Sequence, residues 1–448
     1  MAGKRGRTWR RRGLHKRENR PVSLAHEEHY IRFFRFLKKN GFNGFFLRPA
    51  LFPDTGRGLM VPRRIKRYQT MMKMPEHLIL STRTVLDSVL GPYIENAEPQ
   101  LSTIQAITTF LIYQKHLGET SFWKPYLDVL PKDYTHPVYF GEEDFLYLPH
   151  SLRANVKAKK QECIKSFEEL KPFFPSLEPL LPEWEDIFTF DAFRWAWCTV
   201  KTRSLYVDDK GSTVLRNLDK SGLGVTSLVP MVDLLNHSHS ARTGLLIKKS
   251  CKAGNYFYTV TAEEDYRRGD QVLFCYRRAD NQTLLLNYGF VLPDNHLDLI
   301  KFFLVKDIIG ILELMPFVEE DPKFRRRKVL LIATKYTASD LTCDYRGVSR
   351  TLLTVMRILV CDSEDRPLFK KVLADDLPWD HPVAVQARSL ARELLERRLM
   401  SYGIMDDEAI LQESNTPVRQ LVVAMRNEEK KILQKGLKSL TKNNERHN

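Results

Sequence analysis

The pattern of apolar residues changes near residue 305, and this change restricts the fold more than any other feature. Before it, residues 255–276 alternate between apolar and polar side chains and turn at a Gly-Asp pair, which predicts short strands, and residues 284–295 are expected to close this β-rich zone. After it, residues 381–403 and 416–440 carry apolar residues at helical spacing, and each segment begins at a proline after a polar residue. The chain is therefore predicted to combine an α+β part with a separate helical domain.

The segments before residue 255 alternate between the same two kinds of pattern. Residues 27–42 have the spacing of an amphipathic helix with a glycine at its C-terminal end, and residues 68–80 are strand-like. Residues 82–227 are mostly helical; within them, residues 188–206 have the composition of a buried helix and residues 209–224 form a turn-rich loop. The long helical stretch is thus expected to lie between strand-forming segments.

Length, hydropathy and cysteine content exclude several protein classes. The 448 residues suffice for two or three domains. No apolar run reaches the length of about 18 residues that a membrane span needs, and the N-terminus lacks the apolar core of a secretory signal. The six cysteines are scattered without a Cys-x-x-Cys pair, so neither a zinc site nor a disulfide framework is expected. Reduced thiols predict a cytosolic or nuclear compartment.

The net charge of +15 is unevenly distributed, because residues 1–26 form a basic tail. Repulsion between the like charges predicts that this tail is disordered. It could contact nucleic acid or serve as a nuclear import signal, or it could be a solvated tail without a partner. The tail and the reduced cysteines together favour residence in both nucleus and cytoplasm.

Four short segments carry residues of the kinds used in catalysis and ligand binding. They are residues 54–60 (DTGRGLM), 201–206 (KTRSLY), 232–238 (VDLLNHS) and 275–291 (CYRRADNQTLLLNYGFV). Taken alone, each has an ordinary structural explanation. A Gly-x-Gly is most often a turn, and no third glycine follows at the spacing of a dinucleotide-binding loop.

The histidines and aromatic residues are equally weak signals when considered singly. His237 alone would more often be a hydrogen-bonded structural histidine than a ligand or a base, and His237-x-His239 lacks the further ligands that a metal site needs. Ordinary packing in strands and the core explains the following aromatic residues: Trp195, Trp197, Tyr276 and Tyr288. Only the order of the four segments along the chain is specific.

In this order, the segments resemble the SET domain of protein methyltransferases, in the branch typified by the Rubisco large-subunit lysine methyltransferase. TGRGLM is similar to that family's first cofactor loop, PMVDLLNHS (residues 230–238) to its Asn-His motif, and NYGF to its closing motif. SFWKPYLDVLPKDY (residues 121–134) resembles a signature of the helical insert, and the helical end resembles the substrate-binding domain. The resemblance covers residues 27–440.

The resemblance implies an α+β fold in which a SET domain with a helical insert and a substrate-binding domain follow the basic tail. A SET domain of small knotted β-sheets would occupy residues 27–305, with the helical insert at about residues 82–227. An all-α substrate-binding domain would follow at residues 306–448. The apolar start and polar end of residues 230–238 fit this fold, because the Asn-His segment emerges from the core at the cofactor pocket.

The resemblance also implies S-adenosylmethionine as cofactor and assigns residues to it. The residues placed at the cofactor are Gly56, Arg57, Gly58, Leu59, Arg203, Asp233, Asn236, His237, Tyr276 and Phe290. The two glycines would let the backbone approach the cofactor, and the Arg203 guanidinium would pair with its carboxylate. Asn236 and His237 would contact the adenine, with Phe290 near the ring. Asp233 is either a further polar contact or an ordinary hydrogen-bonded carboxylate.

The implied reaction is in-line methyl transfer to an amine nitrogen, which requires a neutral nucleophile. A free lysine has a pKa of about 10.4, and both an apolar channel and the adjacent sulfonium would lower it, so a dedicated base is not required. Tyr276 would be the catalytic residue that aligns amine and cofactor, and Tyr288 would line the lysine channel. No metal ligands are expected.

Two departures from the family pattern concern local geometry. Arg277 follows Tyr276 where a glycine is frequent, and the family tolerates this. The segment RRIKRYQTMM (residues 63–72) lacks the usual glycine turn, which puts the turn geometry in doubt. A Cys-rich zinc cluster after the SET domain is also lacking, which fits this branch.

The leading hypothesis is a monomeric protein-lysine methyltransferase that acts on an exposed lysine of a histone or non-histone protein. A histidine target is an alternative, because a neutral imidazole needs no pKa shift. A catalytically silent SET-type binding module is another. The substrate protein and the degree of methylation are left open.

Overall fold

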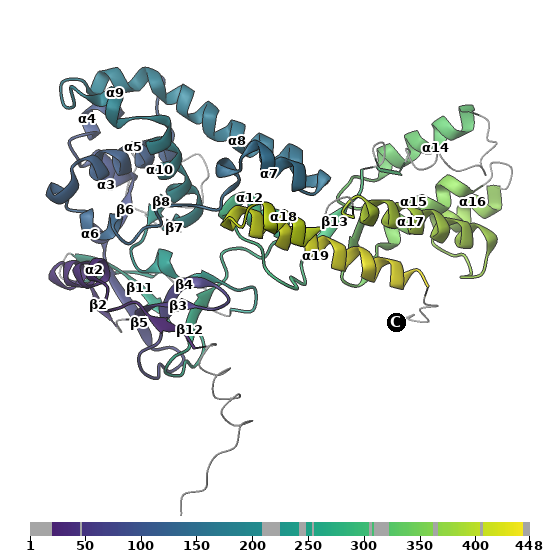
Figure 1. Ribbon diagram of the computed structural model, residues 1–448, viewed down its shortest axis with the longest axis horizontal. Helices are drawn as coiled ribbons and strands as arrows, with labels where there is room; N and C mark the ends of the chain where they lie inside the picture. The colour runs from purple at the N-terminus through teal and green to yellow at the C-terminus, as the bar shows by residue number, and fades with distance from the viewer. Residues whose placement is uncertain are drawn as a thin grey trace, which may run out of the picture. The chain divides into compact units, whose positions relative to one another are not determined.

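The computed structural model describes most of the chain, and the described residues fall into two compact units (Figure 1). The described residues are 20–44, 47–207, 225–241, 248–252, 255–303, 307–308, 322–361, 366–403 and 406–441. The first unit comprises Met1–Tyr134 and Gln161–Arg278; the second comprises Thr135–Lys160 and Ala279–Asn448. The predicted loop at residues 209–224 and most of the predicted basic tail lie outside the described residues. No helix of the described part is both long and apolar enough to cross a membrane.

The described part of the first unit contains three small sheets. The strands of each sheet are given in their spatial order. One has five strands: β1 (Val22–Ser23), β3 (Arg48–Phe52), β4 (Gly56–Met60), β12 (Gln271–Phe274) and β9 (Asn236–His237). The next has β10 (Lys248–Lys252), β11 (Asn255–Thr261), β5 (Thr70–Pro75) and β2 (Asn43–Gly44). The third has β6 (Leu80–Ser81), β8 (Val225–Leu228) and β7 (Leu205–Val207). The described pairs are antiparallel except β12 with β9, which is parallel.

The described helices of the first unit, apart from the first one, lie between β6 and β7, within the stretch predicted to be mostly helical. They are α2 (Glu28–Lys39), α3 (Thr82–Leu86), α4 (Gly91–Glu95), α5 (Thr103–His116), α6 (Lys124–Leu127), α9 (Trp184–Ile187) and α10 (Phe190–Arg203). Short 3-10 turns occur at Glu76–Leu78, Gly118–Thr120, Lys171–Leu177 and Val232–Leu234, the last labelled η5. Helix α8 (His150–Leu170) begins in the second unit and ends in the first.

Two helices show how local sequence determines these elements. Helix α2 buries Tyr30, Phe33 and Leu37 on one face and ends before Gly41, whose φ of 84° is left-handed, which confirms the helix predicted over residues 27–42. Helix α10 confirms the buried helix predicted over residues 188–206. It buries Trp195 and Trp197, and the Trp195 Nε1 donates to the Pro131 carbonyl at 2.9 Å.

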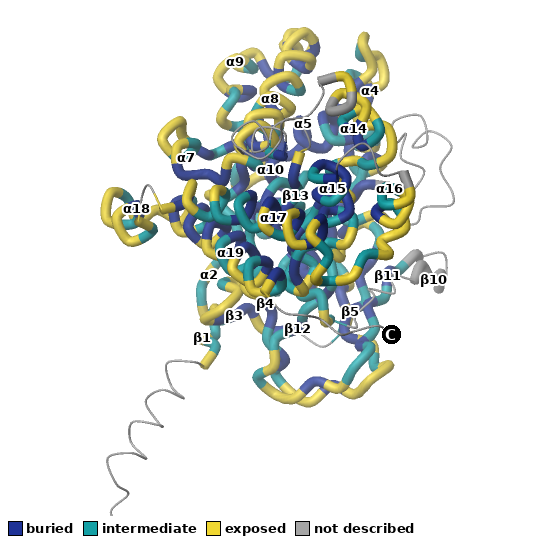
Figure 2. The backbone as a smooth tube through the Cα atoms, turned by 90° about the vertical axis from the view of Figure 1, so that its right-hand side faces the viewer, coloured by how far each residue is buried: buried dark blue, intermediate teal, exposed yellow. Residues whose placement is uncertain are grey.

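The second unit is mainly helical. Its elements are α7 (Glu142–Tyr147), α12 (Asn281–Tyr288), α14 (Pro322–Lys335), α15 (Arg350–Val360), α16 (Arg366–Leu373), α17 (Pro382–Met400), α18 (Asp407–Glu413) and α19 (Pro417–Ser439). A small sheet has the order β13 (Leu299–Lys301), β14 (Thr342–Asp344), β15 (Gly347–Val348), and a 3-10 turn spans Pro137–Tyr139. Its core packs one face each of α15, α17 and α19 together, and Figure 2 shows α15 largely buried.

The two long C-terminal helices confirm the helices predicted over residues 381–403 and 416–440. Pro382 and Pro417 each occupy the first turn, where the missing N–H of proline costs no hydrogen bond. The side chain of the preceding residue caps each helix: His381 accepts from the Val383 N–H at 3.2 Å, and Thr416 accepts from the Arg419 N–H at 3.2 Å.

The prediction that residues 284–295 close a β-rich zone is wrong. The first half of this segment, up to Tyr288, belongs to helix α12. Asp280 caps the start of this helix by accepting from the Thr283 N–H at 2.7 Å. Gly289 ends the helix with a φ of 76°. A Cβ on Gly289 would come within 2.8 Å of the His136 backbone nitrogen, so only glycine fits this end.

The two compact units do not divide the chain at the predicted boundary between residues 305 and 306. These two residues lie outside the described part of the chain. The second unit also takes in residues 135–160 and 279–303. The reason is a second core, in which Phe140, Tyr147 and Leu152 pack with Leu285 and with Val422 of α19. The assignment of residues 27–305 to the SET domain stays a prediction.

Candidate active site

Three of the four motif segments meet at one edge of the five-stranded sheet. Strand β12 pairs on one side with β4, with Val272 opposite Leu59. On its other side it pairs in parallel with β9, with Phe274 opposite His237. The first motif, the Asn-His motif and the segment that ends at Tyr276 are therefore joined side by side through backbone hydrogen bonds.

Asn236 fastens the Asn-His motif to the first motif. Its Nδ2 donates to the Arg57 carbonyl at 2.9 Å and to the Thr55 carbonyl at 3.3 Å. Gly58 makes this close approach feasible, because a Cβ there would lie 2.7 Å from the Asn236 Nδ2 and 2.5 Å from the Gln271 Nε2. Within the protein, the glycine is thus required for packing of two amide side chains.

Gly56 is required for a different reason. Its φ of 71° is left-handed, and it closes the three-residue turn between β3 and β4 opposite Phe52. A Cβ on Gly56 would meet no atom within 4 Å, so the backbone here borders open space. The neighbouring Leu59 is fully buried, and its role at the cofactor stays a prediction. Arg57 is exposed, and its Nη1 donates to the Val129 carbonyl at 3.4 Å.

His237 and Tyr276 hold each other in place. The Tyr276 backbone N–H donates to the His237 Nδ1 at 2.9 Å, and the two ring centroids are 5.1 Å apart. The Phe274 ring contacts Tyr276 from another side at 4.5 Å between centroids. The Tyr276 hydroxyl donates to the Leu235 carbonyl. This hydrogen bond fixes the hydroxyl in position.

Arg203, from the second motif, forms a buried cluster with Asp233 of the Asn-His motif. The Arg203 Nη1 lies 3.3 Å from the Asp233 Oδ2 and also donates to the Asp233 carbonyl. The Asp233 carboxylate is completely buried, whereas 17% of the Arg203 side chain is exposed. The Tyr126 hydroxyl donates to the same Oδ2 at 2.9 Å. Met231 lies two residues before Asp233, and its φ of 70° is rare for a residue with a side chain.

The pKa values in the cluster follow from burial and from the ion pair. Burial is the largest single effect on the Arg203 guanidinium and lowers its pKa, but the Asp233 carboxylate and three nearby tyrosines together outweigh it, so the pKa lies above its ordinary value. Burial also raises the pKa of the Asp233 carboxyl, against the opposing pull of Arg203 and Tyr126. Burial likewise raises the pKa of Tyr134 to about 12. Its hydroxyl lies 2.7 Å from the Thr199 hydroxyl on α10.

Tyr126 and Tyr134 are site residues that the sequence analysis did not assign. Both belong to the SFWKPYLDVLPKDY segment, which was used only as a signature of the insert. The signal that could have found them is a pair of tyrosines in a segment that also resembles the family.

Comparison with known proteins identifies the family. Residues 319–433 match the family model described as Rubisco LSMT substrate-binding. SET domain-containing protein 4 of Mus musculus is 32% identical to this chain over 98% of each protein. Its Homo sapiens counterpart is also 32% identical, over 98% of this chain and 97% of that protein. The chain belongs to the SET domain-containing protein 4 family. The predicted membership in the Rubisco LSMT-like branch of SET-domain methyltransferases is confirmed.

More distant matches extend along the same length. The actin-histidine N-methyltransferase of Homo sapiens is 24% identical over 94% of this chain and 69% of that protein. The structure titled "Crystal structure of the SET domain of LSMT bound to Lysine and AdoHcy" has a TM-score of 0.62 at 20% identity and covers 92% of this chain and 91% of that one. "Structure of Rubisco LSMT bound to Sinefungin and Monomethyllysine" has a TM-score of 0.61 at 21% identity, with 92% of each chain covered. These likenesses confirm the predicted fold, an α+β SET domain with a helical substrate-binding domain.

Tyr288 and Phe290 are part of the second unit of this SET domain-containing protein 4 relative. Tyr288 is the last residue of α12, and Phe290 follows Gly289. Their ring centroids are 6.0 Å apart with the planes tilted by 36°. Their roles in the lysine channel and at the adenine stay predictions.

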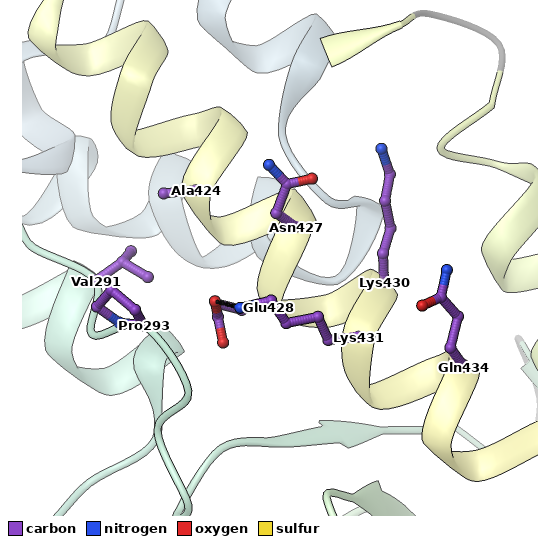
Figure 3. A pocket seen from close by; sticks show the side chains of 8 residues that line it. All are labelled: Val291, Pro293, Ala424, Asn427, Glu428, Lys430, Lys431 and Gln434. Atoms are coloured by element: carbon purple, nitrogen blue, oxygen red, sulfur yellow. Dashed lines mark hydrogen bonds and ion pairs between the residues drawn. The ribbon is translucent and has the colours of Figure 1, made fainter. Parts of the chain in front are cut away.

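The second unit of the protein also has a polar pocket along α19 (Figure 3). Its volume is about 450 Å³, and its lining residues are Val291, Pro293, Ala424, Asn427, Glu428, Lys430, Lys431 and Gln434. The Lys431 Nζ bonds to Glu428 at 2.8 Å and to Asp294 at 3.0 Å, and Glu428 accepts from the Asp294 N–H at 2.9 Å. The pocket therefore offers fixed polar groups to a ligand. No group of histidine, cysteine and acidic residues in the described chain has the arrangement of a metal site.

The first prediction concerns Gly58. We expect Gly58→Ala to lower the free energy of unfolding by about 1–3 kcal/mol, because the new methyl group must displace the Asn236 or Gln271 amide. Urea unfolding will measure this loss. Gly403→Ala is the matched control, because neither glycine has a left-handed φ and a Cβ on Gly403 would meet its nearest atom, the Met400 carbonyl oxygen, only at 3.4 Å. A Gly58→Ala protein as stable as the wild type would contradict the packing role.

The second prediction concerns acid stability. Burial, with the nearby His239, lowers the pKa of His237 to about 4. Between the ordinary pKa of about 6.5 and this value, the unfolded chain binds a proton that the folded chain does not. The free energy of unfolding should therefore fall as the pH falls through this window. Urea unfolding of wild type and His237→Gln at pH 7.5 and 5 will show a smaller pH effect in the variant if His237 is responsible.

Proposed function

We propose that this protein is an S-adenosylmethionine-dependent protein-lysine N-methyltransferase. The observation that carries the proposal is the convergence of β4, β12 and β9 at one sheet edge, with the Tyr276 hydroxyl fixed at the end of β12. Membership in the SET domain-containing protein 4 family supports it. The chain is structurally similar to two solved structures of Rubisco LSMT, whose titles name lysine and monomethyllysine as bound ligands. This similarity supports the choice of lysine.

The chemical groups at this edge suit S-adenosylmethionine, which carries a carboxylate, an ammonium, a sulfonium and an adenine. Arg203 uses its Nη1 on Asp233, and its other guanidinium N–H groups suit the carboxylate. The Asp233 carboxylate is completely buried and pairs with Arg203, so it serves to hold this guanidinium, and its direct contact with the cofactor stays a prediction. The open space beside Gly56 leaves its backbone accessible. When bound, the cofactor supplies an electrophilic methyl group.

His237, which contacts Tyr276, adds no positive charge to a site that must accept a cationic cofactor. The pKa of His237 is about 4, so the imidazole is neutral at neutral pH, and its Nδ1 accepts a hydrogen bond from the Tyr276 N–H. The Tyr276 oxygen can accept a hydrogen bond from a substrate amine and so orient the nitrogen lone pair. The lysine itself must lose a proton to react, and desolvation beside the cationic cofactor lowers its pKa in that direction.

A histidine target is the second candidate, supported by the similarity to actin-histidine N-methyltransferase over 94% of this chain. A neutral imidazole would need no pKa shift. We prefer the lysine proposal because the titles of two solved structures with the same fold name lysine or monomethyllysine as the bound ligand.

The proposed substrate is a histone or non-histone protein with an exposed lysine. The proposed location of the reaction is the nucleus or the cytoplasm. The pocket on α19 is the proposed contact for its polypeptide, because much of its lining lies within the region that matches the substrate-binding model. Fixed charges such as Lys431 and Glu428 suit a polar peptide better than an apolar one.

The experiment uses purified protein and S-adenosylmethionine with an isotopically labelled methyl group. Nucleosomes, free histones and a cell extract are the acceptors, and mass spectrometry maps the label. Paired peptides with lysine or histidine as the single acceptor separate the two candidates. Label on lysine supports the proposal, and label on histidine alone replaces it with the second candidate. A protein that neither transfers label nor binds the cofactor would be a silent binding module.

A further inference from the structure

The turn between β4 and β5 concentrates positive charge around an exposed aromatic ring. Its sequence is PRRIKRYQ, residues 62–69, and Arg63, Arg64, Lys66 and Arg67 are all exposed. Tyr68 is 69% exposed and has a φ of 67°. A left-handed φ is normally a glycine position and is a true outlier for a bulky residue. The chain thus tolerates an unfavourable backbone to present a ring that packs in no core.

Contacts within the first unit hold this turn in a defined conformation. The Tyr68 N–H donates to the Ala262 carbonyl at 2.6 Å, and the Ile65 N–H donates to the Tyr266 carbonyl at 3.0 Å. Asp265 accepts from the Arg67 N–H at 2.8 Å and from the Arg64 guanidinium at 3.2 Å. The Asp265 carboxylate is therefore used to hold the structure of the turn. Backbone hydrogen bonds fix the position of the exposed Tyr68 ring.

The charges of the turn continue into a second hollow of the same unit. One hollow, of about 560 Å³, is lined by Arg64, Lys66, Arg67, Tyr68 and Gln69. The other, of about 510 Å³, is lined by Ala25, Phe34, Arg35, Lys38, Gly44, Leu47, Arg48, Pro62 and Arg63. No acidic residue lines either hollow, and consecutive residues, Arg63 and Arg64, connect them. We call their cations the basic band: Arg35, Lys38, Arg48, Arg63, Arg64, Lys66 and Arg67.

We propose that the basic band, with Tyr68, binds single-stranded nucleic acid. The cations would follow the phosphates, and a base would stack on the Tyr68 ring, which is the combination that single-strand binding surfaces use. The Arg67 guanidinium lies over one face of the Tyr68 ring, 4.6 Å from its centroid, so a base would stack on the opposite face. This site is distinct from the basic tail at residues 1–26 and from the Tyr276 site.

The exposed ring distinguishes a single strand from the other anionic partners. An acidic polypeptide needs cations but gains little from a tyrosine held in a strained conformation. A duplex keeps its bases stacked on one another, so no base face is free for Tyr68. The ring therefore favours unpaired bases as the ligand.

The test compares full-length proteins by fluorescence anisotropy with a labelled oligo-dT of about 20 nucleotides, long enough for a stacking site and several phosphate contacts. Tyr68→Gly removes the ring and places glycine where φ is left-handed, so the fold is retained. We expect it to weaken binding about 10-fold. Lys66→Gln/Arg67→Gln should flatten the plot of log Kd against log salt concentration by about 1.4. Arg326→Gln/Arg327→Gln, two exposed residues of α14, is the matched control and should do neither.

The basic tail is common to all these proteins, so the differences between them report on the basic band alone. A polyglutamate peptide and a hairpin duplex are the competing probes. The proposal is overturned if Tyr68→Gly binds oligo-dT as tightly as the wild type, or if the wild type does not bind it. It is also overturned if either competing probe binds as tightly and depends equally on Tyr68. Circular dichroism melts confirm that each variant is folded.

Discussion

Replacing Tyr276 by phenylalanine is expected to lower kcat for methyl transfer by about 10²-fold or more, with S-adenosylmethionine binding nearly unchanged. The change removes only the hydroxyl group that donates to the Leu235 carbonyl. The ring keeps its contacts with Phe274 and His237, and the hydrogen bond from the Tyr276 N–H to His237 involves the backbone. A labelled-methyl assay for kcat and calorimetry for cofactor Kd will measure the two effects separately.

The control for Tyr276→Phe is the same substitution at Tyr113, a buried tyrosine of α5. It should leave both kcat and cofactor Kd at wild-type values. A structural role for the Tyr276 hydroxyl would instead weaken cofactor binding and transfer together, because the Leu235 carbonyl immediately precedes Asn236. That outcome, or unchanged kcat, would contradict the alignment role.

The long helices could be predicted from the sequence because their signals are local. The apolar spacing of α2 and the prolines at the starts of α17 and α19 lie within the helices themselves. The convergence of the motif segments was expected from resemblance alone, since no local pattern indicates that β12 lies between β4 and β9. Helix α12 was missed because an apolar run does not distinguish a strand from a helix, and its cap at Asp280 is a single side chain.

The features that the sequence left open depend on residues far apart in the chain. Asp233 could be a ligand contact or an ordinary carboxylate; its surroundings are contributed by Tyr126, which is 107 residues away, and by Arg203. The doubt about the turn at residues 63–72 has a similar origin. The absence of a glycine there put the turn geometry in doubt, and the structure shows that Tyr68 itself takes the left-handed φ.

Replacing Arg203 by methionine is expected to lower the free energy of unfolding by about 3 kcal/mol and to abolish S-adenosylmethionine binding. Methionine keeps an unbranched, flexible side chain without the charge and is a good helix former at the end of α10. It leaves the completely buried Asp233 carboxylate with only the Tyr126 hydroxyl, so this group must stay charged without compensation or take up a proton. Urea unfolding and calorimetry will measure the two losses.

Two further variants separate the buried cluster from the site. Lys201→Met, two residues earlier on α10, removes a cation that pairs with Glu162 at 2.9 Å near the surface, and it should cost less than about 1 kcal/mol. Arg203→Met/Asp233→Leu removes both charges and should recover most of the stability, because an apolar pair replaces a buried ion pair at little cost. It should still fail to bind the cofactor, because the cation for the carboxylate is missing. Cofactor binding with wild-type Kd by either Arg203 variant would show that another residue holds the carboxylate, and that Arg203 serves only to neutralise Asp233.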